Sequence, residues 1–191
     1  MRGDRATPAR SGSTPPVIET AVVVTIGPAE AAVGPYRRAH TPSGARGMPA
    51  HVTLMVPFTD GELLDVATIR DLRDELSRFP AFELTLRRFG RWPGPAARPS
   101  EAVLYAVPEP GDPFVEMTAS IAVRFGVLPY ADEHDDIVPH LTIASSADEA
   151  LLDRIEAELA HVFPITTRVT AASLWEHAAD GWRMTAGLPL G

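Results

Sequence analysis

Apolar residues occur along this chain in short runs that end at proline, glycine or charged residues. Runs of β-branched or alternating apolar residues predict strands, whereas an apolar residue at every third or fourth position predicts a helix. Strands are predicted over 19–27, 51–58, 82–89, 102–107, 137–144, 165–177 and 182–188, and helices over 59–79, 112–126 and 146–162. Irregular connections are predicted over 28–50, which is rich in proline and glycine, and over 127–136. This mixture predicts an α+β fold.

Short motifs predict where the helices begin and end. Two Ser/Thr-x-x-Glu sequences have the spacing of a capping box and predict the starts of the first and last helices. An Asp-Pro dipeptide predicts the start of the helix between them. Gly126 predicts the end of that middle helix, and Asp180-Gly181 predicts a hairpin turn between the last two strands. The capping boxes are Thr59 with Glu62 and Ser146 with Glu149, and the dipeptide is Asp112-Pro113.

One order of signals occurs twice. Each copy has His-x-Thr before an aliphatic residue, a capping box, an apolar helix with Leu-Leu-Asp, a Phe-Pro dipeptide and a strand. The copies span 51–80 and 140–164, and the second helix is shorter by about one turn. The repeat predicts two lobes related by a pseudo-twofold axis.

The first 17 residues differ in composition from the rest of the chain. They are rich in Pro, Ser, Gly and Thr, and no apolar segment follows their arginines, so they predict a disordered tail rather than a secretory signal. Residues 18–191 are expected to form a single bilobal domain and a monomer. No apolar run approaches the ~20 residues that a membrane span needs, so we expect a cytoplasmic protein with no membrane partner.

Composition excludes several kinds of chemistry. The 191 residues are 45% hydrophobic and 22% charged, which is sufficient for a buried core. All 17 basic residues are arginine, and neither lysine nor cysteine occurs. This excludes a lysine Schiff base, a lysyl-nucleotide intermediate, thiolate chemistry and a cysteine-ligated zinc. The formal net charge of -8 is unlike that of a protein that coats duplex nucleic acid, so we expect no duplex DNA partner.

The His-x-Thr repeat places imidazoles beside hydroxyls. Residues i and i+2 of a strand project to the same face, so His51 stands beside Thr53 and His140 beside Thr142. If the lobes face each other, all four side chains meet. A neutral imidazole accepts a proton from water, an imidazolium gives one to a leaving oxygen, and hydroxyls bind phosphate oxygens. This set suits in-line attack at phosphorus with no metal ion or cofactor and a bell-shaped pH dependence. The structural alternative is that both pairs only satisfy local backbone groups.

The sequences HVTL at 51–54 and HLTI at 140–143 resemble the paired H-x-[ST]-x motifs of the 2H phosphoesterase superfamily. That superfamily includes 2′-5′ RNA ligase-like proteins and cyclic phosphodiesterases. The resemblance extends over most of the chain, from about residue 19 to 190. It implies two pseudo-twofold-related, antiparallel-rich sheets that line a central cleft, with helices packed outside. It also implies metal-independent hydrolysis of a cyclic phosphodiester, of the 2′,3′-cyclic nucleotide, RNA-end or ADP-ribose cyclic phosphate type.

By motif match, the resemblance makes His51 and His140 the catalytic acid–base pair and Thr53 and Thr142 the residues that bind the substrate phosphate. We place the base at His140 and the acid at His51, and the reverse assignment stays open. RNA-processing members often have a basic residue shortly after the second motif, where this chain has Ala144-Ser145-Ser146. The expected partner is a small nucleotide or an RNA terminus with a cyclic phosphate.

Other residues are candidates for substrate contacts. Arg37, Arg38 and Arg46 are candidates for binding a phosphate, and Tyr130 for stacking on a nucleobase. The alternatives are a solvated loop surface for the arginines and simple packing for Tyr130. A second arginine-rich group comprises Arg87, Arg88, Arg91 and Arg98, and further stacking candidates are Tyr36, Trp92 and Phe58, the last assigned rather to the core. The acidic tract 132–136 lacks the spacing of a calcium loop, so no metal site is assigned.

Two other functions are compatible with the same residues. A binding module could recognise a phosphorylated small molecule or an RNA end without turnover. The reverse reaction, 2′-5′ ligation of RNA, is a third possibility that the acidic net charge disfavours.

Overall fold

A computed structural model describes residues 19–94, 102–128 and 137–191. The predicted tail over residues 1–17 lies outside this part of the chain. In chain order the elements are β1 (Thr20–Thr25), α1 (Gly27–His40), α2 (Pro42–Ala45), β2 (His51–Met55), a 3-10 turn η1 (Gly61–Leu63), α3 (Val66–Leu76), β3 (Phe82–Trp92), β4 (Val103–Glu109), α4 (Asp112–Phe125), β5 (Leu141–Ser145), α5 (Glu149–Leu159), β6 (Ile165–Val169), β7 (Ala171–Ala178) and β8 (Gly181–Pro189). The predicted α+β class is confirmed.

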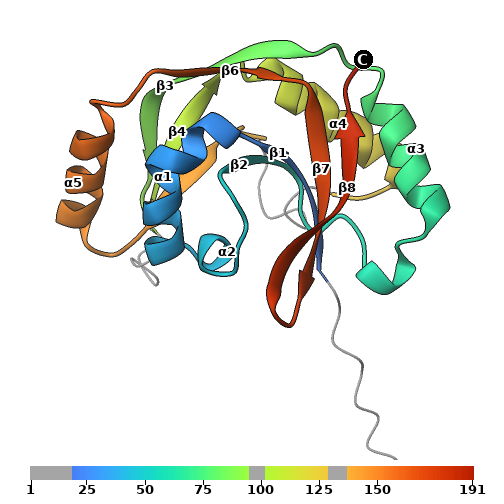
Figure 1. Cartoon of the computed structure of the whole chain (residues 1–191), viewed down its shortest axis with the longest axis horizontal. Helices are drawn as coiled ribbons and strands as arrows, with labels where there is room; N and C mark the ends of the chain where they lie inside the picture. The colour runs from blue at the N-terminus through green and yellow to red at the C-terminus, as the bar shows by residue number, and fades with distance from the viewer. Residues whose placement is uncertain (1–18, 95–101, 129–136) are drawn as a thin grey trace, which may run out of the picture.

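The strands form two four-stranded antiparallel sheets (Figure 1). One sheet has the order β2-β1-β7-β8 and the other has the order β5-β4-β3-β6. The strands that carry the His-x-Thr motifs, β2 and β5, are therefore each at an edge of a sheet. These two edge strands contact each other, so the motifs lie where the sheets meet.

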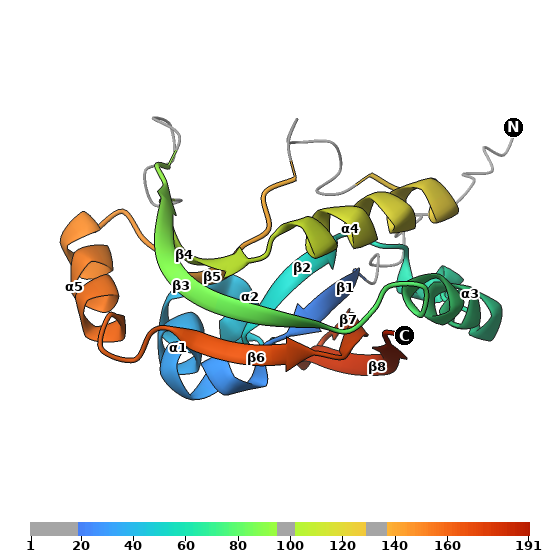
Figure 2. The same cartoon turned by 90° about the horizontal axis from the view of Figure 1, so that it is seen from above.

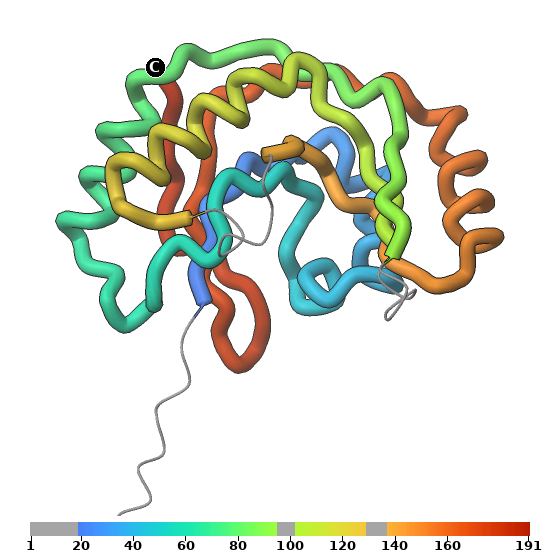
Figure 3. Tube along the Cα trace, turned by 180° about the vertical axis from the view of Figure 1, so that it is seen from behind, coloured from blue at the N-terminus to red at the C-terminus, as the bar shows by residue number. Residues whose placement is uncertain are grey.

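The helices connect the two halves reciprocally. Helix α1 follows β1 of the first sheet but contacts β5 of the second, and α4 follows β4 of the second sheet but contacts β2 of the first (Figure 2). Helices α3 and α5, which follow the two motif strands, lie at opposite ends of the molecule (Figure 3). The two copies of the sequence repeat fall on β2-α3-β3 and β5-α5-β6. The match ends at the helices, because β2 and β3 belong to different sheets whereas β5 and β6 belong to the same sheet.

The alternation of apolar and polar residues decides which faces of the strands are buried. One continuous apolar core includes Val22 and Val24 of β1 together with residues of both sheets. A second, small cluster comprises Ala21, Val23 and Met48, with Trp175 among the residues packed on it. Because Val23 alternates with Val22 and Val24, this cluster lies on the opposite face of the first sheet.

The prediction of an irregular connection over 28–50 is wrong, because this segment contains α1 and α2. Pro28 stands in the first turn of α1, where no intrahelical N–H bond is lost. Pro35 lies inside the same helix, which continues through it. Thr41 begins α2 by accepting a hydrogen bond from Gly44 N at 3.0 Å. Pro28 and Pro42 stand in first turns and Pro35 is accommodated inside α1, so these prolines do not mark breaks in regular structure.

Helices α3 and α5 begin later than predicted, because aspartates cap them instead of Thr59 and Ser146. The Asp65 side chain accepts from Thr68 N at 2.7 Å, and the Asp148 side chain accepts from Leu151 N at 3.1 Å. A carboxylate caps as well as a hydroxyl and adds negative charge at the positive end of the helix dipole. Gly111, rather than Asp112, is the N-cap of α4.

Other boundaries also differ from the prediction. Strand β5 begins at Leu141, so His140 directly precedes the strand. The run over 165–177 forms two strands, β6 and β7, which belong to different sheets. The predicted hairpin between the last two strands is confirmed, but its turn lies at Ala179 and Asp180, and Gly181, with φ 127°, begins β8. Gly126 ends α4 with φ 65°. Among the described residues, no helix is long and apolar enough to cross a bilayer.

The contact between Phe114 and Phe82 predicts a large stability effect. Phe114 of α4 is 1% exposed, and its ring meets that of Phe82 edge-on with centroids 5.4 Å apart. Truncation by Phe114→Ala leaves a cavity in the core and should lower the free energy of unfolding by about 3–5 kcal/mol. Urea unfolding followed by circular dichroism measures the change. The control is Val123→Ala on the same helix, where the side chain is 87% exposed and the expected change is within about 0.5 kcal/mol. Equal midpoints for the two variants would contradict this account of the core.

Candidate active site

The two His-x-Thr motifs occupy matching positions on the adjacent edge strands. His51 and Thr53 lie on one face of β2, while Thr142 lies on β5 and His140 directly precedes that strand. All four side chains are half-buried. The alternate residues Val52, Leu54, Leu141 and Ile143 are at most 1% exposed. The predicted division into a polar face and a core face is confirmed for both motifs.

Both imidazoles form the same hydrogen bond, from Nδ1 to the backbone carbonyl oxygen two residues earlier. Nδ1 of His51 lies 2.7 Å from the carbonyl oxygen of Pro49, and Nδ1 of His140 lies 2.8 Å from that of Val138. A carbonyl oxygen can only accept, so Nδ1 is the donor in each bond and carries the proton. In the neutral ring, Nε2 is then the nitrogen with the lone pair. Each histidine is therefore held in the tautomer that a base acting through Nε2 requires.

Arg37 of α1 contacts both motifs. The residue is 1% exposed, and its Nη1 donates to the main-chain carbonyl oxygen of Thr142. Its Nη2 lies 3.3 Å from Nδ1 of His51 and 3.5 Å from the carbonyl oxygen of Met48. One guanidinium group thus contacts the backbone of the second motif and the ring of the first.

The surroundings of His51 strongly disfavour its charged form. Although the residue as a whole is half-buried, the protein atoms packed around its imidazole displace water from the charged form. This burial lowers the pKa of His51 from its ordinary value near 6.5 to about 3, and the positive charge of Arg37 is the second cause. The hydrogen bond to Pro49 raises the pKa and opposes this shift, whereas the charge of His140 lowers it further. The two imidazoles are therefore close enough for their charges to interact.

Glu30 supports this arrangement from the same helix. Its Oε2 accepts from Ala50 N, next to His51, at 2.7 Å. Burial lowers the pKa of Arg37 to about 10, and the negative charge of Glu30 opposes that decrease. Arg37 consequently stays protonated at neutral pH, and a positive charge lies beside His51.

Two aromatic residues of the second sheet pack against His140. The Trp92 ring meets the His140 ring edge-on at 4.5 Å, and the Tyr105 ring lies 5.7 Å from it. Trp92 and Tyr105 are themselves 4.3 Å apart. Their proximity requires Gly90, because a Cβ at that position would overlap the Tyr105 ring. Tyr105 was not singled out from the sequence, although it alternates with buried residues of β4 and so had to face away from the core.

The other predicted contacts lie in different surroundings. Arg38 is exposed and forms an ion pair with Glu30 at 2.8 Å. Arg46 donates to the carbonyl oxygens of Ala178 and Ala179 in the β7–β8 hairpin, at 3.4 and 3.3 Å. Tyr130 lies outside the described residues.

The remaining sequence candidates are in structural contacts. Tyr36 donates to Glu158 of α5, and Phe58 is 2% exposed in the core, as expected. In the second arginine group, Arg88 pairs with Glu109 at 2.6 Å. Arg87 also pairs with Glu109, Arg91 pairs with Asp153 and Glu156, and Arg98 lies outside the described residues.

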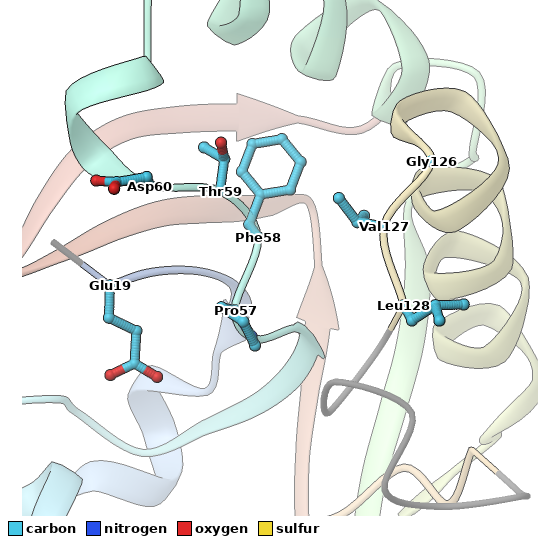
Figure 4. A pocket seen from close by; sticks show the side chains of 8 residues that line it. All are labelled: Glu19, Pro57, Phe58, Thr59, Asp60, Gly126, Val127 and Leu128. Carbon is cyan, nitrogen blue, oxygen red and sulfur yellow. The ribbon is translucent and has the colours of Figure 1, made fainter. Parts of the chain in front are cut away.

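None of the four motif residues lines a cavity of about 680 Å³ (Figure 4). Its walls include Phe58, Val127 and Leu128, with Glu19 and Asp60 as the acidic members. In the described parts of the chain, no three His, Asp or Glu side chains are grouped as metal ligands would be.

A family model described as the 2'-5' RNA ligase superfamily matches residues 27–181, which is most of the chain. The chain belongs to this superfamily, the 2H phosphoesterases. The resemblance inferred from the HVTL and HLTI sequences is therefore confirmed.

Several solved structures share the fold of this chain. E. coli LigT in its apo form is 17% identical, with a TM-score of 0.55 over 92% of this chain and 99% of LigT. LigT complexed with 3'-AMP is 16% identical, with a TM-score of 0.56 over the same shares of the two chains. TT0787 of Thermus thermophilus is 17% identical, with a TM-score of 0.57 over 90% of this chain and 97% of that one. No curated protein matches this member of the superfamily.

The lowered pKa of His51 predicts an acid-sensitive fold. The folded state binds fewer protons at His51 than the unfolded state below about pH 6.5, so stability falls as the pH falls toward 3. Between pH 7 and pH 5 this residue should account for a loss of about 2 kcal/mol in the free energy of unfolding. Urea unfolding of the wild type and His51→Asn at both pH values measures it, with the exposed His161→Asn as the control. An equal loss in wild type and His51→Asn would refute the assignment.

The packing of Tyr105 over Gly90 predicts a second effect. In Gly90→Ala the new methyl group displaces the Tyr105 ring, which should cost about 1–3 kcal/mol of stability and change the near-ultraviolet circular dichroism of Trp92 and Tyr105. Gly187→Ala is the matched control in another strand, since an added Cβ there meets nothing within 4 Å. Identical spectra and stabilities for the two variants would show that Gly90 is not required.

Proposed function

We propose that this chain hydrolyses a cyclic phosphodiester by acid–base catalysis with His51 and His140, without a metal ion. The substrate class is a 2′,3′-cyclic nucleotide, an RNA end with a cyclic phosphate, or an ADP-ribose cyclic phosphate. The observation that carries this proposal is the matched anchoring of both Nδ1 atoms on motifs that meet at the contact of β2 and β5.

The different surroundings of the two rings favour one division of roles. His51 has a pKa of about 3, so it is neutral and has a lone pair on Nε2 over the working pH range. We therefore assign the base to His51 and the acid to His140, the reverse of the assignment preferred from the sequence. A bound phosphate anion beside the ring raises the pKa of His51 and so strengthens it as a base.

The reaction balances with these two groups. His51 Nε2 removes a proton from water as the water oxygen forms a bond to phosphorus, and the opposite P–O bond to the ribose breaks. The His140 imidazolium gives its proton to the departing oxygen. Transfer of the proton from His51 to His140 through solvent then restores the starting state. The hydroxyls of Thr53 and Thr142 donate to the non-bridging oxygens, where negative charge increases in the transition state.

A nucleotide suits the surroundings of this site. Trp92 and Tyr105 lie beside His140, and aromatic faces are the usual platforms for nucleobases. LigT, which shares the fold, has been crystallised with 3'-AMP, ATP, NADP+ and phosphate. These observations support a substrate in which a base or a second ribose lies next to the cyclic phosphate.

The proposal predicts activity on 2′,3′-cyclic nucleotides in the presence of EDTA. Each of His51→Ala and His140→Ala should lower kcat/KM more than a hundredfold, because proton transfer by a positioned side chain contributes about 10²–10⁴-fold. Product formation is measured by ion-exchange chromatography over a panel of cyclic nucleotides and cyclic-phosphate oligoribonucleotides. His161→Ala, at an exposed histidine after α5, is the matched control and should retain full activity.

The possible failures separate the alternatives. If both active-site variants keep wild-type activity, the proposed catalytic pair is wrong. If the wild type binds nucleotide phosphate but changes no substrate of the panel, the chain is a binding module. If it joins RNA ends and hydrolyses none, the reverse reaction is its function.

A further inference from the structure

A buried cation beside an imidazole is an unfavourable arrangement that calls for an explanation. Arg37 is 1% exposed, and its Nε has no hydrogen-bond partner among the described residues. Its closest contacts are neutral: the carbonyl oxygens of Thr142 and Met48, the hydroxyl of Ser43, and the ring of His51. Burial of a charge without a bonded carboxylate costs free energy. The contacts of Arg37 indicate which feature of the site the buried charge stabilises.

We propose that Arg37 is a positioning residue with two effects. It contacts both motifs and so fixes their relative placement, and its charge keeps the His51 ring unprotonated. This inference rests on the proposed function. It makes Arg37 a residue that acts on the two motifs, and no longer a candidate for contact with the substrate. It has two parts, one geometric and one electrostatic, which different substitutions separate.

The geometric part follows from the two amino groups of one planar guanidinium. Nη1 bonds to the backbone of Thr142, whose neighbour two positions earlier is His140, while Nη2 lies against the ring of His51. Strand β5 is an edge strand, so Arg37 satisfies a carbonyl oxygen on its outer side. Because Nδ1 of His51 donates to Pro49, Nη2 makes a packing contact with the ring, and its acceptor near the first motif is the carbonyl oxygen of Met48 at 3.5 Å. The planar fork thus sets the spacing between the segment before His51 and the backbone of Thr142.

The electrostatic part concerns where a proton resides when the site is empty. Among the described residues, the groups that act on His51 are Arg37 from α1 and His140 from the start of β5, while Glu30 of α1 acts on Arg37. Both neighbours of His51 oppose a proton on its ring. The permanent charge of Arg37 lies on the His51 side, so the two otherwise similar motifs become unequal.

Two substitutions separate these parts. Arg37→Gln removes the charge but keeps a donor, whereas Arg37→Lys keeps the charge but loses the fork. In Arg37→Gln, the acidic limb of the kcat/KM pH profile should move upward by about one pH unit, because a neighbouring charge shifts a pKa by about 1–3 units. In Arg37→Lys the limb should stay in place, while kcat falls about ten- to a hundredfold from lost alignment. Arg70→Gln, at an exposed arginine of α3, is the control and should change neither quantity.

Nuclear magnetic resonance of the imidazoles in the unliganded protein gives a readout that does not need turnover. The His51 ring should be the Nδ1–H tautomer in the wild type, and its titration midpoint should rise in Arg37→Gln but not in Arg37→Lys. If these shifts occur while the wild type acts on no substrate, the proposed function fails and the effect of Arg37 on His51 stands. If the wild type is active and neither variant moves the His51 midpoint or the acidic limb, Arg37 has only a structural role. If Arg37→Gln does not fold, wild-type kcat in Arg37→Lys overturns the positioning role.

Discussion

The contact between two edge strands, β2 and β5, is the feature on which the rest of this structure depends. The two strands belong to different sheets, so backbone hydrogen bonds of a common sheet do not hold them together. Their relative placement comes from helices that cross between the halves, with α1 against β5 and α4 against β2. Each lobe thereby supplies a support for the motif of the other lobe. A symmetric site of this kind needs both halves folded before either motif is positioned.

Within that symmetric frame, electrostatics makes the two histidines different. Both rings are anchored through Nδ1 by equivalent carbonyl groups, so local geometry alone would give them equal roles. The first ring lies on a buried guanidinium, and the second lies against two aromatic rings. Acid–base catalysis with two imidazoles requires one neutral and one charged partner. In the proposed mechanism, the different neighbours of His51 and His140 supply that difference, while the motifs themselves stay alike.

The sequence was informative wherever a local periodicity decided the outcome. Alternation identified the buried partners of both motifs, and the repeat identified β2 and β5 as matching motif strands, each followed by a helix. The strands that end the two copies are not equivalent, because β2 and β3 belong to different sheets whereas β5 and β6 belong to the same one. Local signals gave wrong predictions where one residue type is typical of two structures, as proline is of helix starts and of loops, or where two nearby residues could both cap a helix. Pro28 in the first turn of α1 and Pro42 in that of α2 resembled breaks, and Thr59 resembled an N-cap although Asp65 performs that function. The neighbours of the site depended on long-range packing. The sequence around Arg37 does not indicate that its guanidinium is buried against His51 and Thr142, which lie 14 and 105 positions later in the chain.

Placing the motif strands at sheet edges also affects how separate molecules meet. An unpaired strand edge is a template for an added strand from another chain, and two four-stranded sheets have four such edges. Two of these edges face each other at the contact of β2 and β5, and the other two, β6 and β8, contact α1 and α3. The arrangement that brings the imidazoles together therefore also protects the chain against edge-to-edge aggregation.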